Sequence, residues 1–399
     1  MESSPLNKLP QDPLYLIFSS LPIRQIVICR SVCKLLNHTL SSPPFLSLLT
    51  KPIPLLALRP SHNQYHSSPS TCFHSSPHAS DLRVYDPSES RWLSFPLSFF
   101  PFRCPHPVAS SGGLIFLWAE SVTADSSIKL LLACNPLTRE FRVLPQLGSA
   151  WSRHGSVLVD ACKGVIVLTE LAALYLPKFS PTGSPSWLNF SSNLPSKPRS
   201  PVLVRDSVFA ICDVGSPWRS QWKLFSCSLS RLENSSYGGR SNAKEYTGGS
   251  FSFSNRTCWV CMERKEWGDV MDIMKRPRLV QGSGWSLLMV GGLKSTFSLN
   301  PICSTILMLR LNLEKMEWEE AGRMPVEMYR PFAECSKLKV FGGGNKVCFS
   351  AKRLGKMALW DDSKEGDDVW RWVDGVPGGG FEDGLFRGFI YEASLNVSP

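Results

Sequence analysis

Hydrophobic side chains near the start of the chain recur at the spacing of short helices. The first helix is predicted from one face, formed by Leu14, Ile17, Phe18 and Leu21. Asp12 is expected to cap this helix, and Pro22 ends it. Further apolar series predict a second helix over residues 23–30 and a third over residues 32–40, with Ser31 as its cap. A bundle this small leaves apolar side chains uncovered, so the pattern predicts a docking surface.

After residue 81 the pattern changes to short apolar runs separated by polar turns, which is typical of strands. In three places an Asp or Asn precedes an aromatic residue by six positions: Asp86 and Trp92, Asn135 and Phe141, and Asn312 and Trp318. The Asp or Asn suits a hairpin turn, and the aromatic is expected to anchor the next strand. Prolines close these units at intervals of about fifty residues, the period of a propeller blade, except for one longer interval between Pro195 and Pro325 that holds two units and an insert.

The repeat predicts a mainly β fold, in which the N-terminal helices are followed by a β-propeller of six blades. The units span residues 53–96, 106–145, 154–195, 200–267, 280–325 and 332–377. Residues 381–397 are a candidate for a returning strand that completes a blade. The third and fourth units lack a glycine pair, so a seventh blade or an irregular closure stays open.

Glycines and aromatics are the expected scaffold of the blades. A strand, a glycine pair, a second strand, a turn and a Trp at this period resemble the kelch repeat. A glycine lets neighbouring backbones approach closely, and the aromatics fill the space between strands. The scaffold residues predicted in this way are Gly112, Gly113, Gly291, Gly292, Gly342, Gly343, Trp92, Phe141, Trp318 and Trp372.

Two polar segments interrupt the pattern. Residues 50–80 read as a linker and a loop rich in Ser, Pro and His, with the first blade starting near residues 53–58. Residues 231–256 read as a long surface insert within the propeller region, residues 81–397. The alternative for the first segment is a metal site, whose ligands would be His62, His66, Cys72, His74 and His78. The absence of a second cysteine pair favours the loop.

The helical residues resemble an F-box over residues 6–49. The matching positions follow the family's order: Leu9-Pro10, the apolar series up to Leu21-Pro22, Arg30, Val32-Cys33-Lys34 and Asn37, with Leu36 where the family usually has Trp. The resemblance implies docking on the Skp-type adaptor of cullin-RING ubiquitin ligases, with Cys33 as a small buried hydrophobe. The residues that it assigns to adaptor binding are Leu9, Pro10, Leu14, Ile17, Phe18, Leu21, Pro22, Ile26, Val32 and Cys33.

Together the two parts resemble the plant F-box/kelch family, and the last third resembles its subgroup related to leaf-development F-box proteins. The resemblance implies a non-catalytic substrate receptor of an SCF-type ligase, whose partners are the adaptor, the cullin scaffold and a protein target on the propeller loops. One alternative is a kelch scaffold that acts without a ligase. The other is a propeller enzyme, because propellers also host active sites.

Composition narrows these classes. The 399 residues are 43% hydrophobic and 19% charged, which excludes disorder along the whole chain. The start lacks the basic and apolar segments of a signal peptide, and the 13 cysteines fit reduced thiols, so we expect an intracellular protein of the nucleus or cytoplasm without a membrane span. The net charge is +10, but basic clusters such as Lys275, Arg276 and Arg278 are short, so nucleic acid is not the expected partner.

The sequence offers few candidate residues for metal binding, redox chemistry or catalysis. Within the propeller region His106 and His154 are the histidines outside the Ser- and Pro-rich loop, too few for a copper site. Cys258 and Cys261 have redox-motif spacing, but their strand-like neighbours favour two packed or partly exposed thiols. We therefore expect neither a cofactor nor a metal, and no catalytic residue.

Overall fold

The computed structural model describes residues 9–49, 51–59, 81–122, 127–160, 164–177, 186–230, 259–267, 270–294, 303–335, 337–376 and 385–399. Four helices come first: α1 (Gln11–Ser19), α2 (Ile23–Val32), α3 (Lys34–Leu40) and α4 (Pro43–Leu46). We call residues 9–49 the helical module. The predicted linker beyond residue 59 and the insert at 231–256 lie outside the described residues, as do the candidate ligands of residues 62–78.

Two helix boundaries differ from the expectation. The residue before α1 is Pro10, whose side chain cannot accept a hydrogen bond, and Asp12 lies in the first turn instead of capping it. The second helix continues to Val32, so Ser31 caps nothing. Cys33 is the extended residue between α2 and α3, and its Sγ accepts a hydrogen bond from the Leu36 amide at 3.4 Å. A sulfur cap was not predicted because Ser is the more usual capping residue.

The remaining chain forms six four-stranded antiparallel sheets, which confirms the predicted propeller and its six blades. In order from the inner to the outer strand, the first three blades are β24 (Arg387–Ala393), β1 (Ile53–Arg59), β2 (Asp81–Asp86) and β3 (Arg91–Pro96); β4 (Arg103–Ser111), β5 (Leu114–Val122), β6 (Ser127–Asn135) and β7 (Glu140–Val143); and β8 (Ser156–Asp160), β9 (Gly164–Leu168), β10 (Ala172–Pro177) and β11 (Leu188–Ser191).

The other three blades follow the same order from the inner strand outward. They are β12 (Arg199–Val204), β13 (Ser207–Asp213), β14 (Trp222–Ser228) and β15 (Val260–Met262); β16 (Met274–Gln281), β17 (Ser286–Lys294), β18 (Cys303–Asn312) and β19 (Glu317–Arg323); and β20 (Leu338–Gly343), β21 (Lys346–Ala351), β22 (Met357–Asp361) and β23 (Trp370–Val373). Short helices lie between strands: α5 (Ser149–His154), α7 (Val326–Ala333), η4 (Lys265–Trp267) and η5 (Gly366–Val369).

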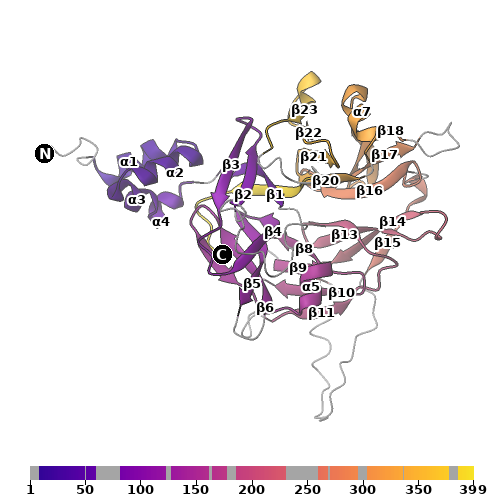
Figure 1. Ribbon diagram of the computed structural model, residues 1–399, viewed down its shortest axis with the longest axis horizontal. Helices are drawn as coiled ribbons and strands as arrows, with labels where there is room; N and C mark the ends of the chain where they lie inside the picture. The colour runs from indigo at the N-terminus through magenta and orange to yellow at the C-terminus, as the bar shows by residue number, and fades with distance from the viewer. Residues whose placement is uncertain are drawn as a thin grey trace, which may run out of the picture.

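The late strand β24 closes the ring. It pairs with β1 along its whole length, from Ile53 opposite Ala393 to Arg59 opposite Arg387. The first blade therefore takes its inner strand from the other end of the propeller sequence, as expected for residues 381–397. The inner strands β24, β4, β8, β12, β16 and β20 each contact the next one, and β20 contacts β24, so the ring is complete (Figure 1).

The alternation of strands gives the propeller two different ends. Inner strands run toward the end where β24 finishes and β1 begins, beside the helical module; we call this the module end. Turns between the first and second, and the third and fourth, strands of a blade lie there. Connections between blades and turns between the second and third strands form the opposite end, which we call the far end. Helix α7 lies at the far end, away from α1–α4 in Figure 1.

The Asp or Asn residues form the same turn in each unit that carries one. Asp86, Asn135 and Asn312 end the third strand of their blades, and each side-chain Oδ1 accepts a hydrogen bond from the backbone N–H two residues later, at 2.9 to 3.0 Å. Asp361 does the same in the sixth blade, at 3.2 Å. The sequence pattern missed it because a longer turn separates it from its aromatic partner, Trp370.

The glycine pairs do not share one structural position. Gly112 and Gly113 form the turn between β4 and β5 with φ of +53° and +82°, whereas Gly291 and Gly292 lie inside the second strand β17. Gly342 and Gly343 lie in the inner strand β20. Each pair allows a close approach of its own; a Cβ on Gly342 would stand 2.2 Å from the Lys346 carbonyl oxygen. The three pairs therefore occupy different positions in their blades and do not form one repeated structural element.

Candidate functional site

The helical module folds around a small core that includes a residue from beyond β24. Ile26, Leu40 and Phe45 are fully buried, and Leu395 is 1% exposed among them. The complete core cluster is Leu14, Tyr15, Phe18, Ile23, Ile26, Leu40, Phe45, Leu49 and Leu395. Since a module of this size has little core of its own, the contribution of Leu395 ties its folding to the propeller.

Polar contacts fix the module on the module end of the propeller. The Asn396 side-chain amide donates to the Leu49 carbonyl at 2.9 Å, and Arg24 pairs with Glu89 of the first blade at 2.7 Å. The tail is held in turn by Asn135, which is fully buried and whose Nδ2 donates to the carbonyls of Ser394 and Val397 at 2.9 and 2.8 Å. Leu49 and Arg24 of the module are thus held against the C-terminal tail and the first blade.

The module exposes several large apolar side chains. Within the described residues, seven of the fifteen exposed large hydrophobic side chains belong to the module. We call them the exposed apolar set: Leu9, Leu16, Ile17, Ile28, Val32, Leu35 and Leu48. Leu16 and Val32 are 70% and 69% exposed. Apolar side chains gathered on so short a segment are typical of a surface that another protein covers.

The structure separates the predicted adaptor-binding residues into two groups. Leu9, Pro10, Ile17, Pro22, Val32 and Cys33 are exposed, and Leu21 is half-buried. Leu14, Phe18 and Ile26 lie in the core instead, with exposed fractions of 7%, 7% and 0%. The expectation that Ile26 touches a partner is therefore corrected: it supports the surface from beneath. The expected burial of Cys33 is also corrected, because its capping position places it at the surface.

The sequence reading missed Leu16, Ile28, Leu35 and Leu48. Ile28 and Val32 are one helical turn apart on α2 and both point outward, while Ile23 and Ile26 point inward. The spacing of Ile28 and Val32 was the available signal, because residues four positions apart share a helix face. This spacing alone does not identify an exposed face, because almost every apolar residue of this short helix could equally belong to the core.

The predicted aromatic scaffold residues make blade contacts. Trp92 donates its indole N–H to the Asp374 carbonyl at 3.0 Å, and Trp318 packs edge-on against Trp267 with ring centroids 5.8 Å apart. Trp372 stacks on Phe332 of α7 at 5.9 Å. Phe141 contacts Phe100 at 5.2 Å but keeps 37% of its surface exposed, because β7 is an outer strand.

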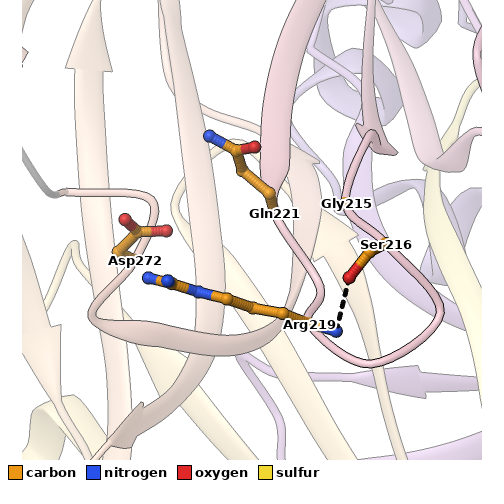
Figure 2. A pocket seen from close by; sticks show the side chains of 5 residues that line it. All are labelled: Gly215, Ser216, Arg219, Gln221 and Asp272. Atoms are coloured by element: carbon orange, nitrogen blue, oxygen red, sulfur yellow. Dashed lines mark hydrogen bonds between the residues drawn. The ribbon is translucent and has the colours of Figure 1, made fainter.

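At the far end, a hollow of about 270 Å³ separates the fourth and fifth blades, and Figure 2 shows the side chains around it. Arg219 extends toward Asp272 across the hollow, and its backbone N–H donates to Ser216 Oγ at 3.2 Å. Gly215 is required here, since a Cβ would stand 2.0 Å from the Arg219 carbonyl oxygen. The same turn presents Trp218, which is 95% exposed. An indole this exposed is a suitable anchor for a protein partner.

A larger hollow lies beside it, between the fifth and sixth blades. Its volume is about 620 Å³, and its lining includes Lys275, Arg276, Arg278, Lys337 and Lys339. We call this hollow the basic cleft. Burial, and then the charges of Arg387 and Arg278, lower the pKa of Lys339 to about 8.

Several described thiols of the propeller have raised pKa values. Burial raises the pKa of Cys134 to about 12 and that of Cys212 to about 11, so neither is a ready nucleophile. Cys261 is exposed on β15, and burial followed by Glu263 raises its pKa; Cys258 lies outside the described residues. Among the residues with described positions, no three His, Cys, Asp or Glu side chains gather as a metal site. The helices within the same ranges are all too short or too polar to cross a bilayer.

Comparisons with known proteins agree with this arrangement. The F-box domain family model matches residues 6–48. The chain is 58% identical over 403 residues to SKP1-interacting partner 15 of Arabidopsis thaliana, with the full length of both proteins covered. It is 24% identical over 425 residues to Protein UNUSUAL FLORAL ORGANS of Arabidopsis thaliana, covering 98% of this chain and 86% of that protein.

Similarity to solved structures is weak. The β-propeller domain of the Trilobed protease from Pyrococcus furiosus aligns with a TM-score of 0.34 and 10% identity, over 70% of this chain and 72% of that one. Family membership therefore rests on the sequence relatives. With a relative 58% identical along its whole length and a matching domain at residues 6–48, the chain belongs to the F-box protein family.

Proposed function

We propose that this protein is the substrate-recognition subunit of an SCF-type E3 ubiquitin ligase. The observation that carries the proposal is the exposed apolar set on the module, which offers a Skp-type adaptor a surface that the propeller leaves free. The name of the relative SKP1-interacting partner 15 supports the same adaptor. The adaptor would connect the module to the cullin scaffold, inside the cell in the nucleus or cytoplasm.

In this role the propeller holds a protein target and supplies no reacting group. The module is fixed at one end of the propeller by Leu395 and Asn396, so a target bound at the far end is held at a constant distance from the adaptor. A receptor of this kind acts by raising the effective concentration of target lysines near the ubiquitin-charged enzyme.

We also propose a distant relation between these blades and kelch repeats, within the plant proteins that resemble leaf-development F-box proteins. The shared turn at Asp86, Asn135 and Asn312 supports the first part. The second part rests on the resemblance of the last third of the chain, and the relatives in Arabidopsis thaliana support the plant origin. The division into a module over residues 6–49 and a propeller over residues 81–397, with its first strand from the intervening segment, belongs to the same proposal.

Co-purification with a Skp-type adaptor tests the proposed function. The informative variant is Ile28→Asp/Val32→Asp, which places charges on two side chains that are 53% and 69% exposed and leaves the module core untouched. Burying two unpaired carboxylates at an interface costs several kcal/mol, so we expect adaptor binding to fall by at least about a hundredfold.

The matched control is Leu171→Asp/Val260→Asp, which alters two exposed hydrophobic residues of the third and fourth blades. This control should bind the adaptor like the parent. Thermal unfolding of all three proteins checks that they fold. A folded parent that fails to bind the adaptor, or equal binding by the Ile28→Asp/Val32→Asp protein, would refute the proposed role.

A further inference from the structure

The basic cleft gathers positive charge from strands that are far apart in sequence. Lys275, Arg276 and Arg278 come from β16, Lys337 directly precedes β20, and Lys339 is the second residue of β20. Inner strands begin at the far end, so these side chains meet at one mouth between the fifth and sixth blades. Among the described residues that line the cleft, none is Asp or Glu.

Neighbouring inner strands extend this charge. Burial, followed by the charges of Arg199, Arg276 and Arg387, lowers the pKa of Arg278. Arg199 begins β12 and Arg387 begins β24, so four inner strands contribute cations to the same end. One acidic group, Asp213, raises the pKa of Arg199 within this cluster. Neighbouring cations repel one another, which is why each lowers the pKa of the others. A bound anion offsets this repulsion and is therefore stabilised at such a cluster.

The floor of the cleft is apolar. Ile306, Phe332 and Val340 line it together with Tyr329, whose hydroxyl donates to the Cys303 carbonyl at 3.0 Å. Phe332 and Tyr329 belong to α7, so this helix contributes part of the lining. A volume of about 620 Å³ is of the size that holds a few side chains. The cleft therefore suits a ligand that joins carboxylates to an apolar side chain.

We propose that the basic cleft binds a short acidic segment of the target protein, with carboxylates on the cations and one apolar side chain on the floor. The inference rests on the proposed function and specifies the chemistry of the target. A peptide fits better than a nucleic acid, because Ile306, Phe332 and Val340 offer a contact surface to an apolar side chain, which a nucleic acid lacks. The exposed Trp218, on the turn between β13 and β14 at the same end of the propeller, offers a second contact to such a target.

Fluorescence anisotropy on the full-length protein tests this inference. The probe is a labelled peptide, Gly-Ser-Glu-Glu-Leu-Glu-Glu-Ser-Gly, and its partner is the same peptide with every Glu replaced by Gln. We expect binding of the acidic peptide to weaken with added salt and the Gln peptide to bind at least about tenfold more weakly. The variant Arg276→Gln/Lys339→Gln should lose about tenfold or more in affinity for the acidic peptide.

The matched control is Lys129→Gln/Arg142→Gln, which removes two charges from β6 and β7 of the second blade and should bind like the parent. Equal affinity for both peptides, no effect of Arg276→Gln/Lys339→Gln, or tighter binding of single-stranded DNA than of the acidic peptide would overturn the inference. Adaptor co-purification separates the two proposals: an Arg276→Gln/Lys339→Gln protein that keeps the adaptor leaves the receptor role standing whatever the peptide result.

Discussion

The variant Leu395→Ala should loosen the helical module while the propeller stays folded. Leu395 is 1% exposed and packs against Phe45, Ile26 and their neighbours, which belong to four separate helices. Removing a buried leucine side chain costs about 2–5 kcal/mol, and the anchored helices limit how far the cavity can collapse. A cost of about 3 kcal/mol would raise the population of the open module about 150-fold.

Amide hydrogen exchange followed by mass spectrometry measures this effect. Peptides covering α2 and α3 should exchange about a hundredfold faster in Leu395→Ala, whereas peptides from β13 in the fourth blade should keep the parent rate. The comparison variant is Leu287→Ala, a fully buried leucine of the fifth blade, which should speed exchange in its own blade. Unchanged protection of α2 and α3 in a Leu395→Ala protein would refute the idea that the tail completes the module core.

Three further outcomes are expected. Asn135→Asp replaces two buried amide donors with a carboxylate facing two carbonyls, so urea denaturation should give a free energy of unfolding lower by about 2–4 kcal/mol. Iodoacetamide should label exposed Cys33 and not buried Cys134, and bound adaptor should slow labelling of Cys33. Between pH 8 and 10.5 the unfolded chain holds more protons on Lys339 than the folded one, so the stability of the parent relative to Lys339→Met should rise with pH; a flat or falling difference contradicts this.

Much of the helical module could be predicted because local signals agree there. Pro22 breaks the chain between two helices, and the apolar spacing predicts helices in nearly the observed places. The division between core and surface could not be predicted, because Leu395, which follows the whole propeller in sequence, decides which side is covered. Ile26 and Ile28 look equivalent in the sequence, yet one is fully buried and the other is 53% exposed.

At the far end, local turns could be predicted from the sequence, but the basic cleft could not. The repeat predicted the blades, and the turns at Asp86, Asn135 and Asn312 were visible because each is local. In the sequence, the cations of residues 275–278 form a short cluster with little meaning of their own. They become part of a cleft only when β16 and β20 lie side by side in the ring, with Arg387 of the late strand nearby. Side-by-side placement of inner strands is a property of the closed propeller and not of any one segment.

Strand β24 has a consequence for the order of events during synthesis. The helices of the module leave the ribosome first, but Leu395 follows only after the strands of all six blades. The same strand begins with Arg387 beside the basic cleft, so both surfaces are finished by the same stretch of chain. A polypeptide interrupted before residue 387 would lack a complete module and a closed ring together. The module of an unfinished chain would therefore be less stable, and such a chain would bind the adaptor more weakly than the complete receptor.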